Sequence, residues 1–184
     1  MSFQFVNITQ NIESLASKLQ AMRSIMLSYY MPIVKKEVEL AKIKPSHNVL
    51  CVGGGYLPCT AMLISEISGA TVTVIDNDLQ AVESSTKLIK KLNLDKKVIV
   101  KHVDGVNIES MDFDVIHIAM QISPKEKVFK EIYSKAHDGA EILVRTPKDH
   151  LERGYQPFKE ICTARDFVKQ PSFSNIGKTL LYVR

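Results

Sequence analysis

The chain has few of the residue patterns that mark a disulfide, a metal centre or a membrane span. Its three cysteines form no Cys-x-x-Cys pair, and Cys51 and Cys59 are expected as small buried thiols in a reducing cytoplasm. The five histidines never recur at the spacing of metal ligands, so no metal site is predicted. No apolar run approaches the ~20 residues of a membrane span, and the N-terminus is polar rather than signal-like. These absences predict a cytoplasmic protein without a membrane partner.

The bulk composition is that of an ordinary globular protein. A chain of 184 residues is long enough for one well-cored domain and short for two. The net charge of +4 is mild, and the lysines between residues 87 and 97 have the spacing of a solvated helix face. This pattern favours a solvated face. The expected partner is a small-molecule acceptor, and no nucleic acid is expected. An acidic partner remains the alternative, and the oligomeric state is left open, a homo-oligomer included.

The most informative segment runs from residue 49 to 58, with the sequence VLCVGGGYLP. A run suited to a buried strand leads into three glycines at 53–55, where a Cβ would block a positive-φ turn and the close approach of a ligand. Pro58 suits the first turn of a helix, whose free N–H groups attract negative or polar ligand atoms. A second apolar run at 71–75 ends on Asp76. Strand, glycine turn, helix, strand and acid form the front half of a nucleotide-type binding fold.

Strand and helix patterns alternate from Asn48 onward. Asp78 is expected to cap the second helix of this series, and Ser123-Pro124 to open the third. The alternation implies parallel pairing with right-handed crossovers. Strands are expected at 48–52, 71–76, 97–102, 113–119 and 140–145, helices at about 58–67, 78–92, 124–136 and 157–164, and a closing antiparallel hairpin at 167–169 and 179–183. The sequence therefore predicts an α/β protein with a Rossmann-like doubly wound, mostly parallel seven-stranded sheet, a C-terminal antiparallel hairpin and N-terminal helices.

Residues 1–44 are predicted to form a helical flank or lid, followed by one globular unit at 45–184. Pro32 is expected to interrupt the first helix, because proline disfavours helical geometry in the residue before it. A second helix is then expected from Pro32 to Ala41. Apolar residues mark one face of the first helix, at Ile12, Leu15, Leu19, Met22 and Met26. Packing on the core is the simplest role for this stripe, and a free partner-binding helix is the alternative.

Two ligand classes use such a glycine turn. The dinucleotide pattern Gly-x-Gly-x-x-Gly needs a third glycine for close helix–strand packing, and Pro58 occupies that position here. S-adenosylmethionine has no pyrophosphate and needs only a glycine loop, an acid for the ribose and a platform for the adenine. Asp76 can accept from both ribose hydroxyls, and Asp104 can accept from the adenine amino group. Each acid has a simpler alternative role, a helix cap at 76–78 and an Asp-Gly turn at 104–105.

These motifs carry a family resemblance that covers about residues 45–184. The segments CVGGGYLP, VTVIDND, HVDG, FDVIHIA and HDGAEILVR resemble the strand ends of the class I S-adenosylmethionine-dependent methyltransferase fold. Within that superfamily, the glycine run followed by Leu57-Pro58 is similar to the loop of nicotianamine synthases and their archaeal relatives. The segments VRTP at 144–147 and RGY at 153–155 are similar to a run in the same synthases. The chain departs from many methyltransferases at Cys51, where they carry an acid.

The resemblance and the motifs together assign a cofactor site and weaker candidates for the reacting end. The catalytic candidates are Gln121 to orient an amine, Arg145 to bind a carboxylate bidentately, and Tyr30 and Tyr155 to line the acceptor pocket. His117 is expected as a core histidine. The S-adenosylmethionine site is assigned to Gly53, Gly54, Gly55, Tyr56, Leu57, Asp76, Asn77, Asp104, Gly105, Val106 and Ala119.

We therefore expect an S-adenosylmethionine-dependent transferase, in the first instance a methyltransferase acting on a small molecule. The absence of an obvious general base is compatible with this, because aligning an activated sulfonium with its acceptor supplies most of the catalysis. The glycine loop favours the alternative, aminocarboxypropyl transfer as in nicotianamine synthase. An NAD-dependent oxidoreductase and a non-catalytic cofactor-binding module remain further alternatives.

Overall fold

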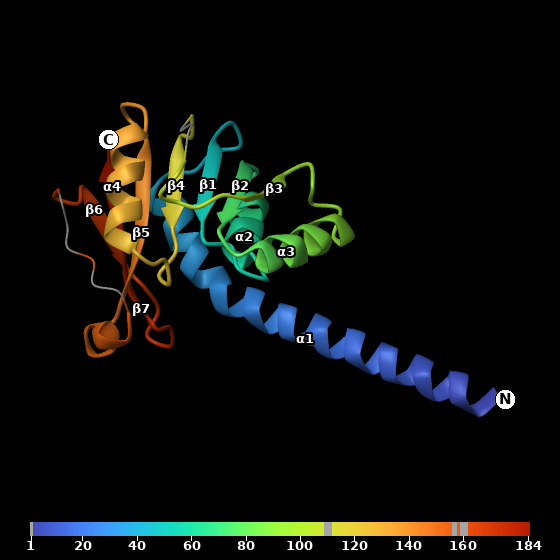
Figure 1. Cartoon of the computed structure of the whole chain (residues 1–184). Coiled ribbons are helices and arrows are strands. Elements are labelled where there is room, and N and C mark those ends of the chain that lie inside the picture. Colours follow the sequence, from blue (N-terminus) through green and yellow to red (C-terminus); the bar gives the residue numbers. More distant parts are fainter. Residues whose placement is uncertain (1, 109–111, 156–157, 159–161) are drawn as a thin grey trace.

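The structure is a computed structural model that describes residues 2–108, 112–155, 158 and 162–184. Within these residues a seven-stranded sheet forms the centre, in the order β3-β2-β1-β4-β5-β7-β6 (Figure 1). Strands β1 to β5 pair in parallel, whereas β7 lies antiparallel between β5 and β6. The strands are β1 (Asn48–Val52), β2 (Thr71–Asp76), β3 (Val98–His102), β4 (Val115–Ile118), β5 (Glu141–Pro147), β6 (Asp166–Lys169) and β7 (Ile176–Val183). The predicted fold class is confirmed.

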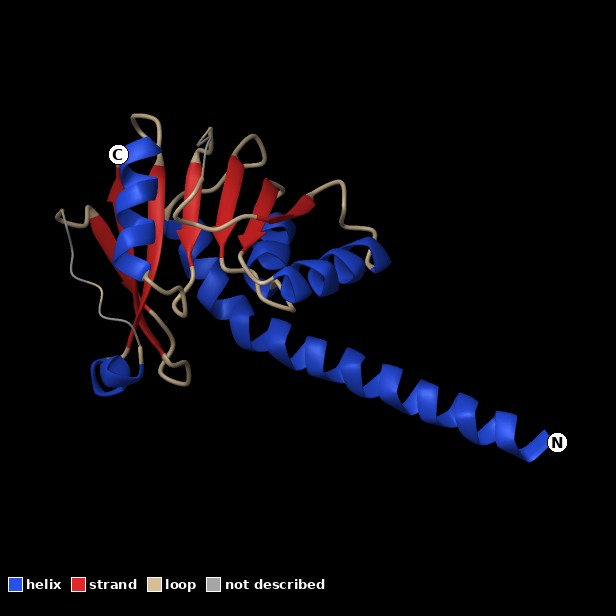
Figure 2. Cartoon of the chain, viewed as in Figure 1, coloured by secondary structure: helices blue, strands red, loops and turns tan. Residues whose placement is uncertain are grey.

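Helices pack around this sheet, which Figure 2 shows in red with the helices in blue. Successive side chains of a strand point to opposite faces, so neighbouring residues join different parts of the core. Val49 packs with the layer that contains residues of α1, α2 and α3. Leu50, the next residue, packs with Phe129 of α4 in the layer on the other face. The helices are α1 (Ser2–Leu40), α2 (Cys59–Ser68), α3 (Leu79–Lys91), α4 (Lys125–Lys135) and the short 3-10 helix η1 (Asp149–Gly154).

Helix α1 is continuous, and Pro32 lies inside it. The expected interruption at Pro32 is therefore wrong. Ile33 and Val34 are fully buried, and Val34 joins the core layer beside α2, so tertiary packing outweighs the local preference of the residue before a proline. The N-terminal half of α1 extends away from the sheet (Figure 1). The C-terminal part of the helix supplies residues to the core of the sheet domain. The domain boundary expected at residue 44 stays a prediction.

The sequence predicted the cap of α3 correctly but not the cap of α4. Asp78 caps α3 as predicted, because its carboxylate accepts from the backbone N–H groups of Gln80 and Ala81. Helix α4 begins at Lys125, close to the expected start, but the expected cap by Ser123 is wrong because the helix has no side-chain cap. Pro124 occupies the cap position with an extended backbone, and a proline side chain has no oxygen that could accept a hydrogen bond from the helix.

The helix expected at 157–164 falls largely outside the described residues. Phe158 and residues 162–164 are described and are not helical. The ring of Phe158 packs edge-on against Phe129 of α4, with 5.3 Å between centroids. This aromatic contact places the Phe158 ring against the core layer of α4.

The C-terminal hairpin is confirmed as the antiparallel pair β6 and β7. Strand β7 begins earlier than expected, because Ile176 pairs with Pro147 at the end of β5. Among the described residues, no helix combines the length and the hydropathy that crossing a membrane requires. Cys51, Cys59 and Cys162 are all free thiols.

Candidate functional site

The three glycines form a bare turn between β1 and α2. Gly53 and Gly55 have positive φ angles of 88° and 59°, which side chains rarely adopt. A Cβ on Gly53 would collide with the Ile122 side chain, and a Cβ on Gly54 would collide with a methyl group of Val74. The loop therefore fits only as glycine at these positions.

Asp76, at the carboxyl end of β2, holds this loop in place. Its Oδ2 atom accepts a hydrogen bond of 2.7 Å from the backbone N–H of Gly55, and its Oδ1 atom accepts one of 3.0 Å from the N–H of Asp78. Asp78 rather than Asp76 caps α3. Because each carboxylate oxygen has a second acceptor position, Asp76 retains capacity for two hydroxyl donors of a ligand.

A cavity of about 500 Å³ opens beside the loop, at the carboxyl ends of β1, β2 and β4. This is the crevice in which open α/β sheets bind ligands, at the point where the strand order reverses. Most residues assigned to the cofactor line this cavity, namely Gly53, Gly54, Gly55, Tyr56, Leu57, Asp76, Asn77, Asp104, Gly105 and Ala119. Three of the catalytic candidates, Tyr30, Gln121 and Arg145, line it as well.

Two assigned residues have positions that the sequence did not indicate. Val106 is not among the cavity-lining residues; its side chain packs against the core layer of α4, and its N–H donates to Oδ1 of Asp104. Asp104 therefore lies in an Asp-Gly turn and at the cavity wall at once. Tyr56 is about half exposed, and its hydroxyl lies 3.3 Å from Oδ2 of Asp78, at the start of α3.

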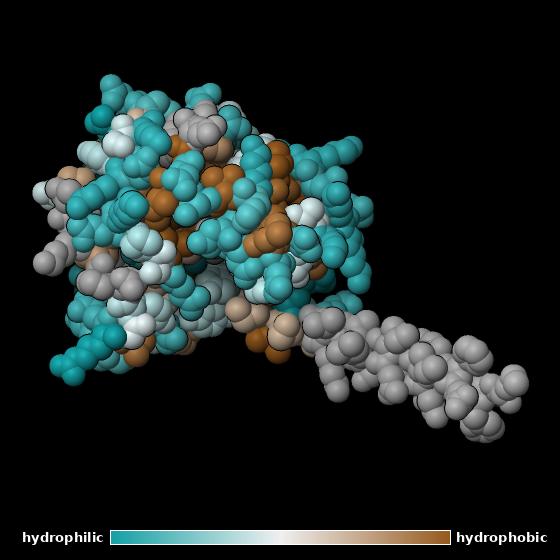
Figure 3. Space-filling model, in the orientation of Figure 1, coloured by the Kyte–Doolittle hydropathy of each residue, from teal (hydrophilic) through white to brown (hydrophobic). Residues whose placement is uncertain are grey.

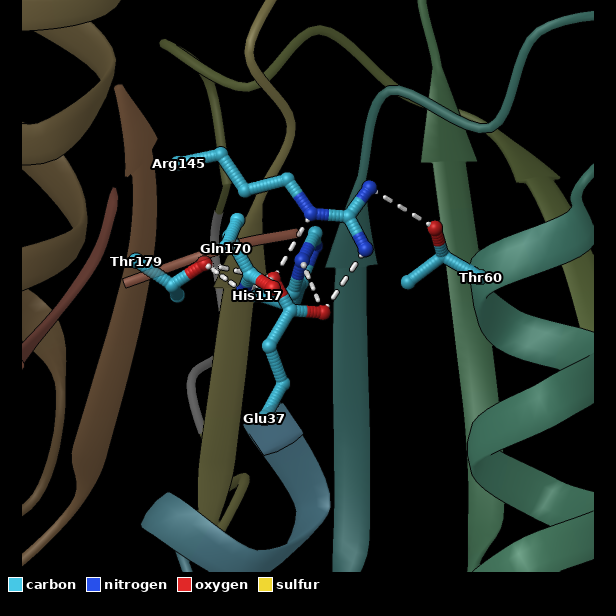
Figure 4. Close-up of polar contacts among 6 residues, drawn as sticks. All are labelled: Glu37, Thr60, His117, Arg145, Gln170 and Thr179. Carbon is cyan, nitrogen blue, oxygen red and sulfur yellow. Dashed lines mark hydrogen bonds and ion pairs between the residues drawn. The ribbon is translucent and has the colours of Figure 1, made fainter. Parts of the chain in front are cut away.

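The floor of the cavity is a buried polar cluster, which Figure 4 shows in close-up. Arg145 of β5 forms a bidentate pair with Glu37 of α1, with Nε to Oε1 at 2.8 Å and Nη2 to Oε2 at 2.7 Å. Its Nη1 donates to Thr60 of α2 at 3.0 Å. Glu37 also accepts from the Thr179 hydroxyl at 2.7 Å, and His117 Nε2 lies 3.4 Å from Oε2. The guanidinium edge that would grip a ligand carboxylate bidentately is thus already occupied by Glu37.

The charge states of this floor follow from its burial. Burial alone would raise the pKa of the Glu37 carboxyl, but Arg145 and His117 hold that pKa well below its usual range. Burial and the neighbouring Arg145 lower the pKa of His117. The floor therefore carries one carboxylate, one guanidinium and a neutral imidazole, with no net charge.

Three side chains beside this floor, those of Tyr30, Cys51 and Cys59, are neutral. Burial raises the pKa of the Tyr30 phenol, and it raises the pKa of the Cys51 thiol to about 12 and that of the Cys59 thiol to about 11. Since a thiol reacts as the thiolate, neither cysteine is poised as a nucleophile. Tyr30 can act through hydrogen bonds as a neutral phenol.

Glu37 is the functional-site residue that the sequence analysis missed. Ile33, Val34, Val38 and Ala41 are buried at helical spacing on α1, and Glu37 lies among them with no exposed surface. A charged residue in the middle of an apolar helical stripe is the signal that could have found it. His117 is buried at 1% exposure, as expected for a core histidine, but it also lines the cavity.

A second, wider groove of about 790 Å³ lies next to the first cavity. The two share the wall formed by residues 120–123, after β4. Tyr155, the remaining catalytic candidate, lines this groove together with His150 and Arg153 from η1. Gln121 borders both spaces, so it lies between the cavity and the groove.

The sheet order, the glycine turn and the crevice define a methyltransferase-like α/β protein, and one similar solved structure is a complex with S-adenosylmethionine. Within this class, the chain belongs to the nicotianamine synthase protein family, whose model matches residues 6–178. The resemblance noted in the glycine loop is thereby confirmed.

Solved structures of MtNAS agree with this assignment. The complex of MtNAS with MTA and tNA is 26% identical, with a TM-score of 0.81, and covers 91% of this chain and 65% of that one. A mutant of MtNAS in complex with S-adenosylmethionine is 25% identical, with a TM-score of 0.78, over 92% and 74% of the two chains.

A curated relative gives a third comparison. L-Histidine 2-aminobutanoyltransferase of Yersinia pestis is 28% identical over 121 residues, which are 65% of this chain and 44% of that protein. The chain thus spans less than half the length of this relative and about two thirds of MtNAS.

Proposed function

We propose that the chain binds S-adenosylmethionine in the cavity and transfers its aminocarboxypropyl group to the amine of a small acceptor. The observation that carries this proposal is the three-glycine loop pinned to Asp76 at the cavity edge, in a chain of the nicotianamine synthase family. The names of two similar proteins support it, since MtNAS binds S-adenosylmethionine in one crystal structure and the Yersinia pestis relative is an aminobutanoyltransferase.

Different cavity residues contact different parts of the ligand. Asp76 accepts from the ribose hydroxyls while it keeps its bond to the loop. Asp104, held in its turn by the N–H of Val106, accepts from the adenine amino group. Gly53, Gly54 and Gly55 carry no side chains, so the ligand can approach the backbone of the loop closely. The reacting end then lies toward Tyr30 and Arg145, at the floor.

S-adenosylmethionine brings an activated sulfonium, so the protein mainly has to align the acceptor nitrogen with the carbon that is transferred. The chain supplies a neutral floor, which leaves the positive sulfonium without a nearby net repulsive charge. Tyr30 is a neutral phenol at this point, able to accept a hydrogen bond from an incoming amine.

The groove beside the cavity is the proposed entry of the acceptor. Gln121 lies on the shared wall, where its amide can orient an amine that approaches from the groove. Arg153 and His150 on η1 provide positive or polar partners for a carboxylate on the acceptor, and Tyr155 adds an aromatic side wall. An amino acid or a similar small amine fits this set of groups. The free thiols support the cytoplasm as the place where the protein works.

The first experiment measures S-adenosylmethionine binding by calorimetry for the wild-type protein, Asp76→Ala and Asp78→Ala. We expect Asp76→Ala to weaken binding by at least ~10-fold, because it removes the ribose acceptor and the loop contact, each worth on the order of 1 kcal/mol or more. Asp78→Ala loses the cap of α3 and the contact with the Tyr56 hydroxyl but keeps the Asp76 carboxylate, so it measures how much of the effect comes from disturbing α3 alone. Absence of wild-type binding at millimolar ligand, or full binding by Asp76→Ala, contradicts the proposal.

The second experiment identifies the reaction by mass spectrometry of the spent cofactor, with L-histidine and a panel of small amines as acceptors. Methylthioadenosine identifies aminocarboxypropyl transfer, and S-adenosylhomocysteine identifies methyl transfer, the first expectation from the sequence. Tight binding without turnover over the whole panel would instead support a non-catalytic binding module.

A further inference from the structure

We propose that Glu37 and Arg145 are positioning residues, whose buried pair holds Tyr30 and Thr60 at the floor of the cavity. The inference rests on the proposed function for its effect on turnover, and on the contacts of the pair for its structural part. It assigns a role to the cluster in Figure 4 that neither ribose nor adenine recognition requires.

The pair is fully desolvated and has nearly ideal geometry. Glu37 is 0% exposed and Arg145 is 4% exposed. Two parallel hydrogen bonds of 2.8 and 2.7 Å join them, which is the bidentate arrangement that fixes both distance and orientation. Thr179 of β7 bonds to the same carboxylate at 2.7 Å. The guanidinium plane therefore has no free rotation.

This fixed guanidinium contacts two residues of the cavity from two different helices. The ring of Tyr30 on α1 lies over it, with 5.4 Å between the Arg145 Cζ atom and the ring centroid, a distance typical of a cation–π contact. Thr60, in the first turn of α2, accepts from Nη1 at 3.0 Å. Arg145 thus ties the helix after the glycine loop to the aromatic side chain that faces the reacting end.

Arg145 contacts α1 at two residues, Tyr30 and Glu37. Tyr30 and Glu37 are seven residues apart, two helical turns, so they lie on the same side of α1. Glu37 anchors this side to β5 and β7, and Arg145 contacts it again at Tyr30. Two attachment points on one helical face define the rotation of α1 about its axis, and hence the place of the Tyr30 hydroxyl.

Stability alone gives a poor account of this arrangement. Replacing a buried ion pair by well-packed apolar side chains is often neutral or stabilising, because the desolvation of two charges cancels most of their attraction. A directional pair is useful where geometry has to be exact, and here both partners contact residues at the cavity floor. The geometry therefore points to positioning of the reacting end.

The test compares Arg145→Lys, the double variant Glu37→Met with Arg145→Met, and the control Ile132→Val. The double variant removes both charges together, so it avoids an unpaired buried charge. Ile132→Val removes one buried methyl group from the core layer of α4, away from the cluster and from the cavity lining. Thermal unfolding of each variant is measured alongside turnover.

For the double variant we expect a kcat reduced by at least ~30-fold, a melting temperature near the wild-type value, and S-adenosylmethionine affinity within about threefold of wild type. Arg145→Lys keeps the positive charge but loses the two parallel hydrogen bonds of the guanidinium, and it should also lower kcat more than the affinity for S-adenosylmethionine. Ile132→Val should lower the melting temperature without changing kcat. Wild-type kcat in the folded double variant, or a kcat loss in all variants that follows their melting temperatures, overturns the proposal.

A measurement independent of turnover separates this inference from the proposed function. Amide hydrogen exchange of the ligand-free double variant should be faster than wild type at residues 27–33 of α1 and 59–62 of α2, because both contacts of the guanidinium are lost. Unchanged exchange in these segments overturns the positioning role even if the wild-type enzyme is inactive. A wild-type protein without turnover, with faster exchange in the double variant, would contradict only the proposed function.

Discussion

Gly54 is confined by a single methyl group. A Cβ at this position would collide with Cγ1 of Val74, while its next neighbours, Pro58 Cβ and Val74 Cβ, both lie at 3.7 Å. Its φ angle is not in the positive range, unlike those of Gly53 and Gly55. The requirement for glycine at residue 54 is thus steric rather than conformational.

Gly54→Ala should therefore lower S-adenosylmethionine affinity by about 10-fold or more, because the loop has to move away from β2. Adding Val74→Ala removes the colliding methyl group and should restore most of the affinity, with roughly 2 kcal/mol lower stability from the lost core volume. Calorimetry measures the affinity and urea unfolding the stability. Val74→Ala alone is the control, and a double variant that binds no better than Gly54→Ala would show that the collision is not the cause.

The residues that the sequence located correctly are those whose role is local. Gly53, Gly54, Gly55 and Asp76 directly follow β1 or end β2, and parallel strands bring their carboxyl ends to one edge, where these residues now line the cavity. The pair of Glu37 and Arg145 joins residues separated by 108 positions. A single sequence contains no pattern that links two such distant side chains, so their pairing was not predictable, although each residue could be singled out on its own.

At the scale of elements, α1 shows how packing can override a local rule. Pro32 lacks an N–H and cannot donate to the carbonyl one turn before it, yet the helix continues on both sides. The burial of Ile33 and Val34 on the core explains the continuation. Further out, Met22 and Ile25 are 54% and 67% exposed, and Figure 3 shows hydrophobic side chains where α1 leaves the domain.

Pro32→Ala should stabilise the protein, by up to about 3 kcal/mol, because alanine restores the missing hydrogen bond in the helix interior. The greater flexibility of alanine in the unfolded chain offsets about 0.4–1 kcal/mol of this gain. Urea unfolding measures the difference in the free energy of unfolding, provided that both proteins have the same m-value. A less stable variant would mean that the structure around residue 32 requires the proline ring.

The elements that the sequence predicted best are those with strong local patterns. The bounds of β1 and β2 match the apolar runs, and Asp78 caps α3. In the segment between β5 and β6 the sequence analysis did not predict the short helix η1, and the described Phe158 contacts Phe129 of α4, a tertiary contact that no local pattern indicates. Patterns along the chain indicate elements, whereas tertiary contacts decide where irregular segments lie.

At the scale of the whole molecule, Glu37 connects elements from both ends of the chain. Its carboxylate joins α1 to β5 through Arg145, to β7 through Thr179 and to β4 through His117. Since its pKa is held below the ordinary value of 4.5, the contribution of the carboxylate to stability is complete above that pH. That contribution is lost as the pH falls below 4.5 toward the lower pKa of the folded state.

Glu37→Gln should accordingly be less stable than wild type at pH 7, and the difference should shrink as the pH falls below 4.5. The change is on the order of 1.4 kcal/mol for each pH unit over which only the folded form stays ionised. Urea unfolding of both proteins between pH 7 and pH 2.5 measures it. A difference that stays constant down to pH 3 would contradict the assigned ionisation.

The anchoring of α1 near one end has a mechanical consequence. If the helix tilts about Glu37 as a pivot, the rise of 1.5 Å per residue places Tyr30 ~10 Å and Ser2 ~52 Å from that point. The far end of this lever then travels roughly five times as far as the phenol for the same angle. A fluorophore or spin label near Ser2 would therefore amplify small tilts of α1, while the side chain over the cavity moves very little.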